Sequence, residues 1–161
     1  MLDFIGYNSY NSRIPCRIAL LLPIAACLTP VGSGPALSET LSGPIPATIE
    51  RVVDGDTLAV RAHIWLGQEI RVLVRIRGID TPELRGRCDM ETRRAERAAE
   101  RTTDATEAGT VTLFRIAPDK YHGRVLADVT LADGRDLASV LLNTGAARRY
   151  DGTARGDWCL G

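Results

Sequence analysis

Residues 69–83 read EIRVLVRIRGIDTPE, and this stretch is the starting point for predicting the fold. Polar and apolar side chains alternate over much of residues 69–77, a pattern typical of a strand with one buried and one solvated face. The pair Thr81 and Pro82 then interrupts the pattern, because proline lacks an amide donor and restricts the residue before it. We therefore predict a half-buried strand over 69–77 that ends in a polar turn.

Further strands are expected on both sides of this stretch. The apolar residues between positions 47 and 60 indicate two short strands, which the Asp-Gly-Asp turn at 54–56 separates. Downstream, strands are expected at 110–117 and 124–131.

Two helices complete the predicted fold. Residues 90–108 are rich in Ala, Arg and Glu and contain neither Gly nor Pro, so they predict a helix that ends at Gly109. A shorter helix is expected at about 136–143, ending near Gly145. Strands, helix, strands and short helix make an α+β arrangement that is compatible with a small barrel.

Composition narrows the class of protein. A chain of 161 residues has room for one ordinary domain, and its hydrophobic share of 45% and charged share of 25% are typical of globular proteins. The formal net charge of zero argues against a protein that coats nucleic acid non-specifically, because such binding needs a large excess of cations. An enzyme acting on phosphodiesters is not excluded, since it needs positive charge only at its cleft.

The first 38 residues have the pattern of a secretory signal peptide. Arg13 and Arg17 precede an apolar run at 18–28, and a Pro, Gly and Ser-rich stretch ends in small residues at 36–38. The apolar run is too short to span a bilayer comfortably. We therefore predict a cleaved signal peptide over 1–38 and a mature domain over 39–161, exported to the periplasm or secreted, with an uncleaved N-terminal anchor as the alternative.

A lipid anchor is a second possibility for the same segment. The residues Ile24-Ala25-Ala26-Cys27 resemble a bacterial lipobox, in which the cysteine becomes the lipidated N-terminus. In that case the protein would be anchored to the envelope, and membrane association is expected only if Cys27 is lipidated.

Removal of 1–38 leaves two cysteines, Cys88 and Cys159. In an oxidising compartment an even pair in a small domain predicts a disulfide, which would tie the end of the chain to its middle. Zinc binding by these cysteines with His63 and His122 is the alternative, although no pair has close ligand spacing.

Three clusters of residues have the chemistry that phosphodiester hydrolysis requires. That reaction needs a base to direct water at phosphorus, cations to neutralise the developing charge, and often a metal ion. Carboxylates occur at 54–57 (DGDT) and 80–83 (DTPE), and cations occur at Arg75 and at 120–124 (KYHGR). Oxygen ligands at a tight turn suit a hard cation, but Asp54 is expected to accept hydrogen bonds within its own turn.

The segments VDGDT at 53–57, RIRGIDTPE at 75–83 and DKYHGR at 119–124 resemble, in the same order, the three signatures of the staphylococcal nuclease (thermonuclease) family. The resemblance covers roughly residues 47–150. It implies a five-stranded OB-fold β-barrel with a long and a short helix packed on it. It also implies Ca²⁺-dependent cleavage of DNA and RNA that leaves a 3′-phosphate and a 5′-hydroxyl.

The resemblance assigns a metal site to three of these residues. Asp56 and Asp80 would bind Ca²⁺ through their carboxylates and Thr81 through its backbone carbonyl. Two carboxylates are few for this ion, so the site is expected to be weak and to be completed by water and substrate.

The same resemblance assigns the catalytic and substrate-binding roles. Glu83 would position or deprotonate the attacking water, while Arg75 and Arg124 would hold the phosphate, with Arg124 also near the leaving oxygen. Lys120 and Tyr121 would contact a neighbouring phosphate.

Three features of the sequence bear on the roles that the family resemblance assigns. Tyr150 is expected near the cleft, where it either stacks on a base or packs. His122 separates Tyr121 from Gly123, where the family is expected to run directly from Tyr to Gly-Arg. The chain also ends soon after Tyr150 without a long C-terminal helix, and we expect the bridge between Cys88 and Cys159 to replace that helix as a fastening.

The alternative function is a non-catalytic OB-fold module that binds single-stranded nucleic acid or a protein partner, because OB barrels serve both purposes. We expect Trp65 and Trp158 to pack against the barrel, with stacking on nucleic-acid bases as the alternative. A third interpretation is an envelope lipoprotein whose barrel is only structural. No stable protein partner is predicted and the chain is expected to be a monomer, with DNA and RNA as its substrates.

Overall fold

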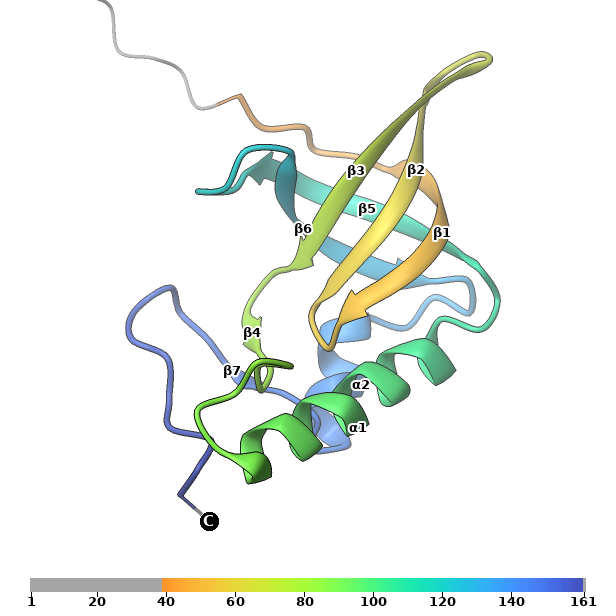
Figure 1. Cartoon of the computed structure of the whole chain (residues 1–161). Coiled ribbons are helices and arrows are strands. Elements are labelled where there is room, and N and C mark those ends of the chain that lie inside the picture. The colour runs from red at the N-terminus through yellow and green to blue at the C-terminus, as the bar shows by residue number, and fades with distance from the viewer. Residues whose placement is uncertain (1–38, 161) are drawn as a thin grey trace, which may run out of the picture. The chain divides into compact units, whose positions relative to one another are not determined.

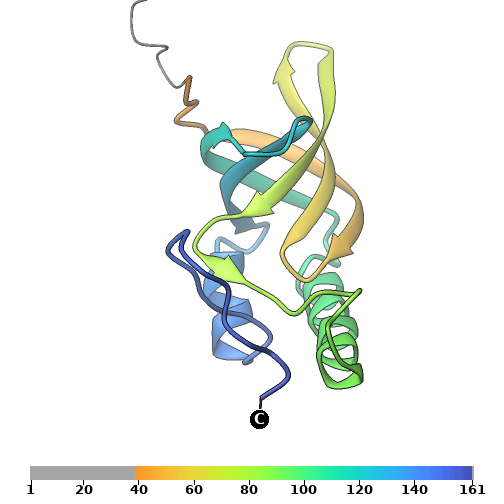
Figure 2. The same ribbon diagram turned by 60° about the vertical axis from the view of Figure 1, so that its left-hand side comes forward.

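Five strands close into a barrel in the computed structural model, which describes residues 39–160 (Figures 1 and 2). The barrel strands are β1 (Ile45–Asp54), β2 (Thr57–Trp65), β3 (Gln68–Ile76), β5 (Thr110–Pro118) and β6 (Arg124–Leu131). Their order around the barrel is β1-β2-β3-β6-β5, and β1 pairs with β5 to close it. Only the pairing of β3 with β6 is parallel. The predicted α+β fold with a five-stranded barrel is confirmed.

Strand β3 shows why the alternating pattern predicts the fold. Val74 and Ile76 point into the barrel and are fully buried, while Arg75 between them lies on the opposite face. The interior is filled by aliphatic side chains from neighbouring strands, including Leu58, Val60 and Val129. A shift of one residue would move Arg75 into the core, so the pairing register is strongly specified.

Two helices lie at one end of the barrel (Figures 1 and 2). Helix α1 spans Asp89–Ala105 and begins at the N-cap Cys88, whereas helix α2 spans Leu137–Asn143 and begins at the N-cap Asp136. The predicted helix over 90–108 is too long by three residues at its C-terminus. The helix ends at Thr106, where the backbone leaves the helical conformation (φ −105°, ψ 16°) and the hydroxyl caps the Thr102 carbonyl.

A two-residue ladder outside the barrel was not expected from the sequence. Strand β4 (Ile79–Asp80) pairs antiparallel with β7 (Arg148–Arg149), and the Tyr150 amide donates to the Gly78 carbonyl at 3.0 Å. Strands of two residues have no periodicity to detect. The ladder matters because it brings the C-terminal part of the chain beside residues 78–83.

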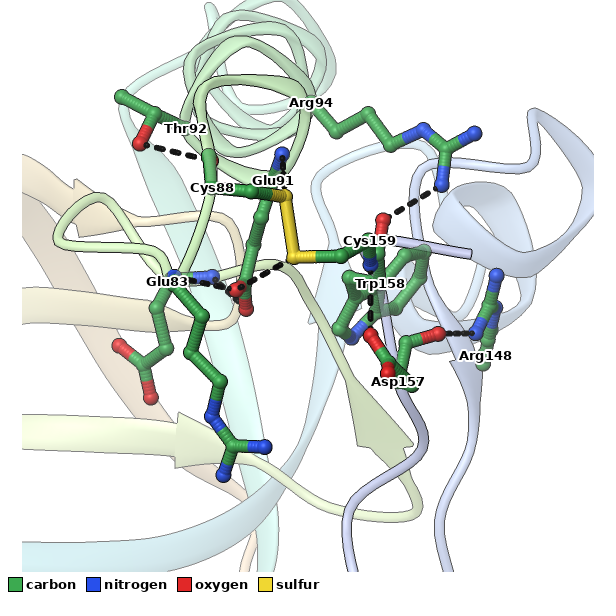
Figure 3. Close-up of a disulfide and its surroundings, with 10 residues drawn as sticks. Glu83, Cys88, Glu91, Thr92, Arg94, Arg148, Asp157, Trp158 and Cys159 are labelled. Carbon is green, nitrogen blue, oxygen red and sulfur yellow. Dashed lines mark hydrogen bonds between the residues drawn. A yellow bond between two sulfur atoms is a disulfide. The ribbon is translucent and has the colours of Figure 1, made fainter. Parts of the chain in front are cut away.

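A disulfide joins Cys88 to Cys159 with their Cα atoms 6.1 Å apart, so the predicted pairing is confirmed (Figure 3). It connects the start of α1 to the segment that follows β7. The bridge removes both cysteines from the alternative zinc site.

The two tryptophans differ in their surroundings. Trp158 is buried, as expected, but Trp65 is 76% exposed, so the expectation that it packs on the barrel is wrong. Trp65 lies at the turn of the β2–β3 hairpin, which extends beyond the rest of the barrel (Figure 1). No strand is available there to cover its side chain.

The predicted signal peptide at 1–38 and its Cys27 lie outside the described residues. Between residues 39 and 160, no helix is long and apolar enough to cross a membrane.

Candidate active site

One cleft of about 650 Å³ brings the three predicted clusters together. It is lined by all of the predicted catalytic, metal-binding and substrate-binding residues except Asp80. The lining residues among them are Asp56, Arg75, Thr81, Glu83, Lys120, Tyr121, Arg124 and Tyr150. Asp80 lies behind the wall of the cleft, where it is 3% exposed.

Asp56 connects three parts of the cleft wall. Its Oδ1 accepts from the Thr57 hydroxyl at 3.0 Å and pairs with the Arg75 guanidinium. Its Oδ2 accepts from both the backbone N–H and the hydroxyl of Thr81, each at 3.1 Å. A carboxylate this deeply buried requires such partners, and they fix its position.

The turn that carries Asp56 is tightly packed. The Asp56 amide donates to Asp54 Oδ1 at 3.1 Å, so Asp54 has the turn-stabilising hydrogen bond expected of it. A Cβ atom on Gly55 would lie 2.8 Å from Ala98 Cβ and 2.9 Å from Thr81 Cβ, so only glycine fits. The Thr102 hydroxyl of α1 donates to the Gly55 carbonyl at 2.7 Å. Helix α1 therefore packs directly against the turn and fixes its position.

Asp54 adds to the negative charge beside Asp56. Burial, and next the charge of Asp56, raise the pKa of Asp54 to about 6. Carboxylates crowded in this way favour the approach of a cation.

Asp80 is held by β4 and by two cationic side chains. Its Oδ1 accepts from Arg155 Nε at 2.7 Å and lies 3.7 Å from Arg75 Nη2. Its Oδ2 accepts from the Trp158 indole N–H at 3.1 Å. Arg75 therefore lies between Asp56 and Asp80 and draws the two carboxylates toward one place.

Glu83 is a more exposed carboxylate at the mouth of the cleft, with 53% of its side chain accessible. The loop that carries it is fixed by Glu91, a buried residue of α1. Glu91 accepts from the backbone amides of Glu83 at 3.4 Å and of Arg87 at 2.8 Å. The prediction from sequence missed Glu91, because a glutamate in a charged helix gives no sign of being buried.

Two arginines reach the cleft from adjacent strands. Arg75 is on β3, and Arg124 begins β6, which pairs in parallel with β3. Arg75 also donates to the Ile79 carbonyl at 3.2 Å, and its guanidinium carbon lies 5.9 Å from the centre of the Tyr150 ring. Arg124 pairs with Asp119 and stacks 4.6 Å from the centre of the Tyr121 ring.

His122 lies in an exposed turn directly before β6, which begins at Arg124. The Arg124 amide donates to the Tyr121 carbonyl at 3.3 Å, and Gly123 adopts a φ of 78° that favours glycine. Lys120 and Tyr121 are exposed beside each other, with the lysine ammonium 5.1 Å from the ring centre. The turn therefore holds His122 on the exposed side, and Arg124 lies at the start of β6.

Arg155 is the residue of the site that the prediction missed most completely. Besides Asp80, its guanidinium contacts the Thr81 carbonyl at 2.6 Å and the Glu83 carboxylate. These partners are more than 70 positions away in the sequence. An arginine in a Gly-rich segment carries no local signal of such contacts.

The oxygen atoms on this side of the cleft are of the kind that bind a hard cation. Oxygens of Asp80, Thr81 and Glu83 converge on one positively charged group, and carboxylates with a backbone carbonyl are ligands that Ca²⁺ accepts. Between residues 39 and 160, no three His, Cys, Asp or Glu side chains are grouped so as to hold a metal ion. The predicted calcium ligands do not form such a group, because they are only two carboxylates, Asp56 and Asp80, together with the backbone carbonyl of Thr81.

Comparison with known families gives one match. The family model described as staphylococcal nuclease homologue matches residues 73–157, just over half of the chain. The match includes Arg75, Asp80, Glu83 and Arg124 and begins after Asp56. No curated protein matches the chain. With its closed five-stranded barrel and this match, the chain belongs to the family of staphylococcal nuclease homologues.

Proposed function

We propose that the protein is a Ca²⁺-dependent nuclease that hydrolyses phosphodiester bonds in DNA and RNA and leaves 3′-phosphate products. Membership of a nuclease family supports this proposal. The observation that carries it is the placement of Glu83, Arg75 and Arg124 along one cleft, beside the buried carboxylates of Asp56 and Asp80.

Asp56, Asp80 and the Thr81 carbonyl are the proposed ligands of Ca²⁺. When bound, the ion would supply positive charge beside the phosphate and so reduce the cost of the charge that develops during attack. Because the side chains of the set provide only two carboxylates, binding is expected to be weak.

Glu83 is the proposed general base. Its exposed carboxylate would accept a proton from the water that attacks phosphorus, while the bond from phosphorus to the 5′ oxygen breaks. The 5′ oxygen then takes up a proton and leaves as a hydroxyl, and the phosphate stays on the 3′ side. The contacts of Glu91 with the Glu83 loop would hold this base in position.

Arg75 and Arg124 are the proposed electrostatic catalysts. Both guanidinium groups are mostly buried, with 17% and 19% of their side chains exposed, so their charge acts in a poorly solvated site. Each offers a planar pair of donors that matches phosphate oxygens. We assign Arg124 a position near the leaving oxygen.

Lys120, Tyr121 and Tyr150 are proposed to contact the polymer on either side of the scissile bond. All three line the cleft, and the exposed rim formed by Lys120 and Tyr121 is suited to a neighbouring phosphate. Aromatic rings at such positions also stack on bases of any sequence.

We further propose that the protein is a monomer. We also propose that a signal peptide at 1–38 directs its export and that it acts in the periplasm or outside the cell. The disulfide between Cys88 and Cys159 supports an oxidising compartment. Lipidation of Cys27 would instead anchor it to the envelope. Mass spectrometry of the mature protein distinguishes a start at residue 39 from a lipid-modified start at Cys27.

The decisive assay for the activity is the release of acid-soluble nucleotides from single-stranded DNA and from RNA, with Ca²⁺ or with a chelator. Glu83→Gln is expected to lower the rate by about 10²- to 10⁴-fold, because it removes the base and leaves the shape of the side chain. Glu107→Gln, an exposed position beyond the end of α1, is the matched control. A folded protein that binds single-stranded DNA without cleaving it would instead support the non-catalytic OB-fold module.

A further inference from the structure

Arg155 contacts the same oxygens that the proposed function assigns to the metal ion and to the base. Its Nε donates to Asp80 Oδ1 at 2.7 Å, one Nη donates to the Thr81 carbonyl at 2.6 Å, and the other Nη pairs with Glu83. A guanidinium is always charged at physiological pH. One positive group therefore neutralises three oxygens from three different residues.

Arg155 belongs to a segment that is fastened at one end, the C-terminal strap (residues 151–159). The disulfide from Cys159 to Cys88 and a hydrogen bond of 2.8 Å from Arg94 to the Trp158 carbonyl connect the strap to α1 (Figure 3). Arg148 donates to the Asp157 carbonyl at 2.9 Å, and its guanidinium carbon lies 3.9 Å from the centre of the Trp158 ring (Figure 3).

The strap also contacts the candidate metal site directly. Trp158 is buried, and its indole N–H donates to Asp80 Oδ2 at 3.1 Å. Both oxygens of Asp80 are therefore engaged by the strap, one by Arg155 and the other by Trp158. Arg155 itself keeps 39% of its side chain exposed, so a path to solvent is open to it.

We propose that Arg155 competes with the divalent cation for Asp80 and the Thr81 carbonyl while it also pairs with the base Glu83, so that the C-terminal strap sets the calcium affinity of the site. This inference rests on the metal site of the proposed function. A guanidinium and a divalent cation cannot share these oxygens at contact distance, because two positive groups a few ångströms apart in a poorly solvated site repel strongly. Calcium must therefore displace Arg155 before it binds.

Competition of this kind has a calculable effect. The apparent dissociation constant rises by the inverse of the fraction of molecules in which the ligands are free. If Arg155 holds them in nine of ten molecules, the apparent Kd for calcium is about tenfold higher than the intrinsic value. Removal of Arg155 is expected to recover that factor.

A purely structural role for Arg155 predicts the opposite result. If the arginine only held the ligands in place, Arg155→Gln would weaken calcium binding. Under competition the same change strengthens calcium binding, while the unfolding temperature in chelator falls because Asp80 and Glu83 lose their partner. The two effects have opposite signs.

Trp158 provides a reporter for the test, because it donates to Asp80 and the chain has only two tryptophans. Trp65→Phe removes the other tryptophan at an exposed position, so the remaining fluorescence comes from Trp158. We would titrate this protein with CaCl₂, follow Trp158 fluorescence, and repeat the titration by calorimetry. The comparison adds Arg155→Gln, Arg155→Lys, and Arg101→Gln as a charge-matched control on the exposed part of α1.

The expected result is a Kd for calcium about tenfold lower in Arg155→Gln, a smaller decrease in Arg155→Lys, and no change in Arg101→Gln. Far-UV circular dichroism tests whether each variant is folded. If Arg155→Gln does not fold, the calcium Kd of Arg155→Lys decides the outcome. Unchanged or weaker calcium binding would overturn the competition and leave the proposed nuclease in place. No calcium binding by any of the proteins would overturn both the competition and the proposed metal site.

Discussion

The barrel wall, meaning β2, β3 and the turn at 54–56, and the C-terminal strap meet at the same cleft. Different interactions hold the two parts in place. Asp56 lies in the turn directly before β2, and Arg75 lies on β3. The antiparallel ladder between these strands pairs Thr57 with Arg75, so it holds Asp56 and Arg75 beside each other. The strap follows β7 and forms no strand pairing itself, so it is held by the disulfide and by a few side-chain contacts. The wall is held by ladder hydrogen bonds along its length, whereas the strap is fastened at its C-terminal end and otherwise held by side-chain contacts such as those of Arg155.

This difference indicates which part carries the chemistry and which part can move. Catalytic groups need to be fixed within fractions of an ångström, and a ladder with buried hydrogen bonds provides that. Local opening is easiest where backbone contacts are few and exposure is high. We therefore expect only changes in the wall to lower the rate of cleavage at saturating calcium, whereas changes in either part alter stability and calcium affinity.

The largest effect is expected from a break in the wall. Arg75→Gln removes one phosphate-binding group and should lower kcat/KM by about 10²- to 10³-fold. It also leaves Asp56, which is 3% exposed, without its cation, and this should cost about 3 kcal/mol of unfolding free energy.

Urea unfolding and cleavage assays measure both effects, with Arg101→Gln as the control for charge. A variant that keeps the wild-type rate while Asp56 and Asp80 remain in place would show that the wall does not carry the chemistry.

The next largest effect is expected from release of the strap. Replacement of both Cys88 and Cys159 by serine opens a loop of 71 residues, and the gain in chain entropy should lower the unfolding free energy by about 4 kcal/mol. At saturating calcium the folded variant should still cleave near the wild-type rate, because the wall is unchanged.

Urea unfolding and the calcium dependence of cleavage test this separation, and the wild-type protein treated with reductant serves as a second form of the same change. A folded variant that cleaves as poorly as Arg75→Gln would show that the strap supplies catalytic geometry, contrary to the comparison.

A smaller effect is expected from Gly55→Ala, which tests how tightly the wall is packed. The new methyl group would lie within 3 Å of Ala98 and Thr81, and such overpacking typically costs about 1–3 kcal/mol. Because Thr81 is a proposed calcium ligand, the Kd for calcium should rise as well. Thermal unfolding and calcium titration measure both effects, and an unchanged unfolding temperature and Kd would show that the turn has room for a methyl group.

Most of the wall could be predicted from sequence, for physical reasons that do not apply to the strap. The alternation before Asp80 places Arg75 on a strand, since a period of two is visible in a single sequence. The disulfide is the one feature of the strap that could be predicted, from the even pair of cysteines left if the predicted signal peptide is removed.

The contacts of Arg155 could not be predicted in that way. They depend on pairing of β4 with β7, and strands of two residues have no detectable period. The burial of Glu91 was also missed, because it arises from the loop that folds back over the start of α1. Trp65 shows the converse error, since a large aromatic residue was expected to pack and is exposed on a hairpin turn.

The most direct test of the account is a crystal structure of the protein grown with calcium. We expect the cation to be bound by the carboxylates of Asp56 and Asp80 and the carbonyl of Thr81, with Arg155 displaced from Asp80 and Thr81, the Arg75 guanidinium shifted away from Asp56, and the barrel unchanged. A structure in which Arg155 still bridges Asp80 and Glu83 at saturating calcium, with the ion bound elsewhere or absent from the cleft, would contradict the proposed metal site and the competition for it.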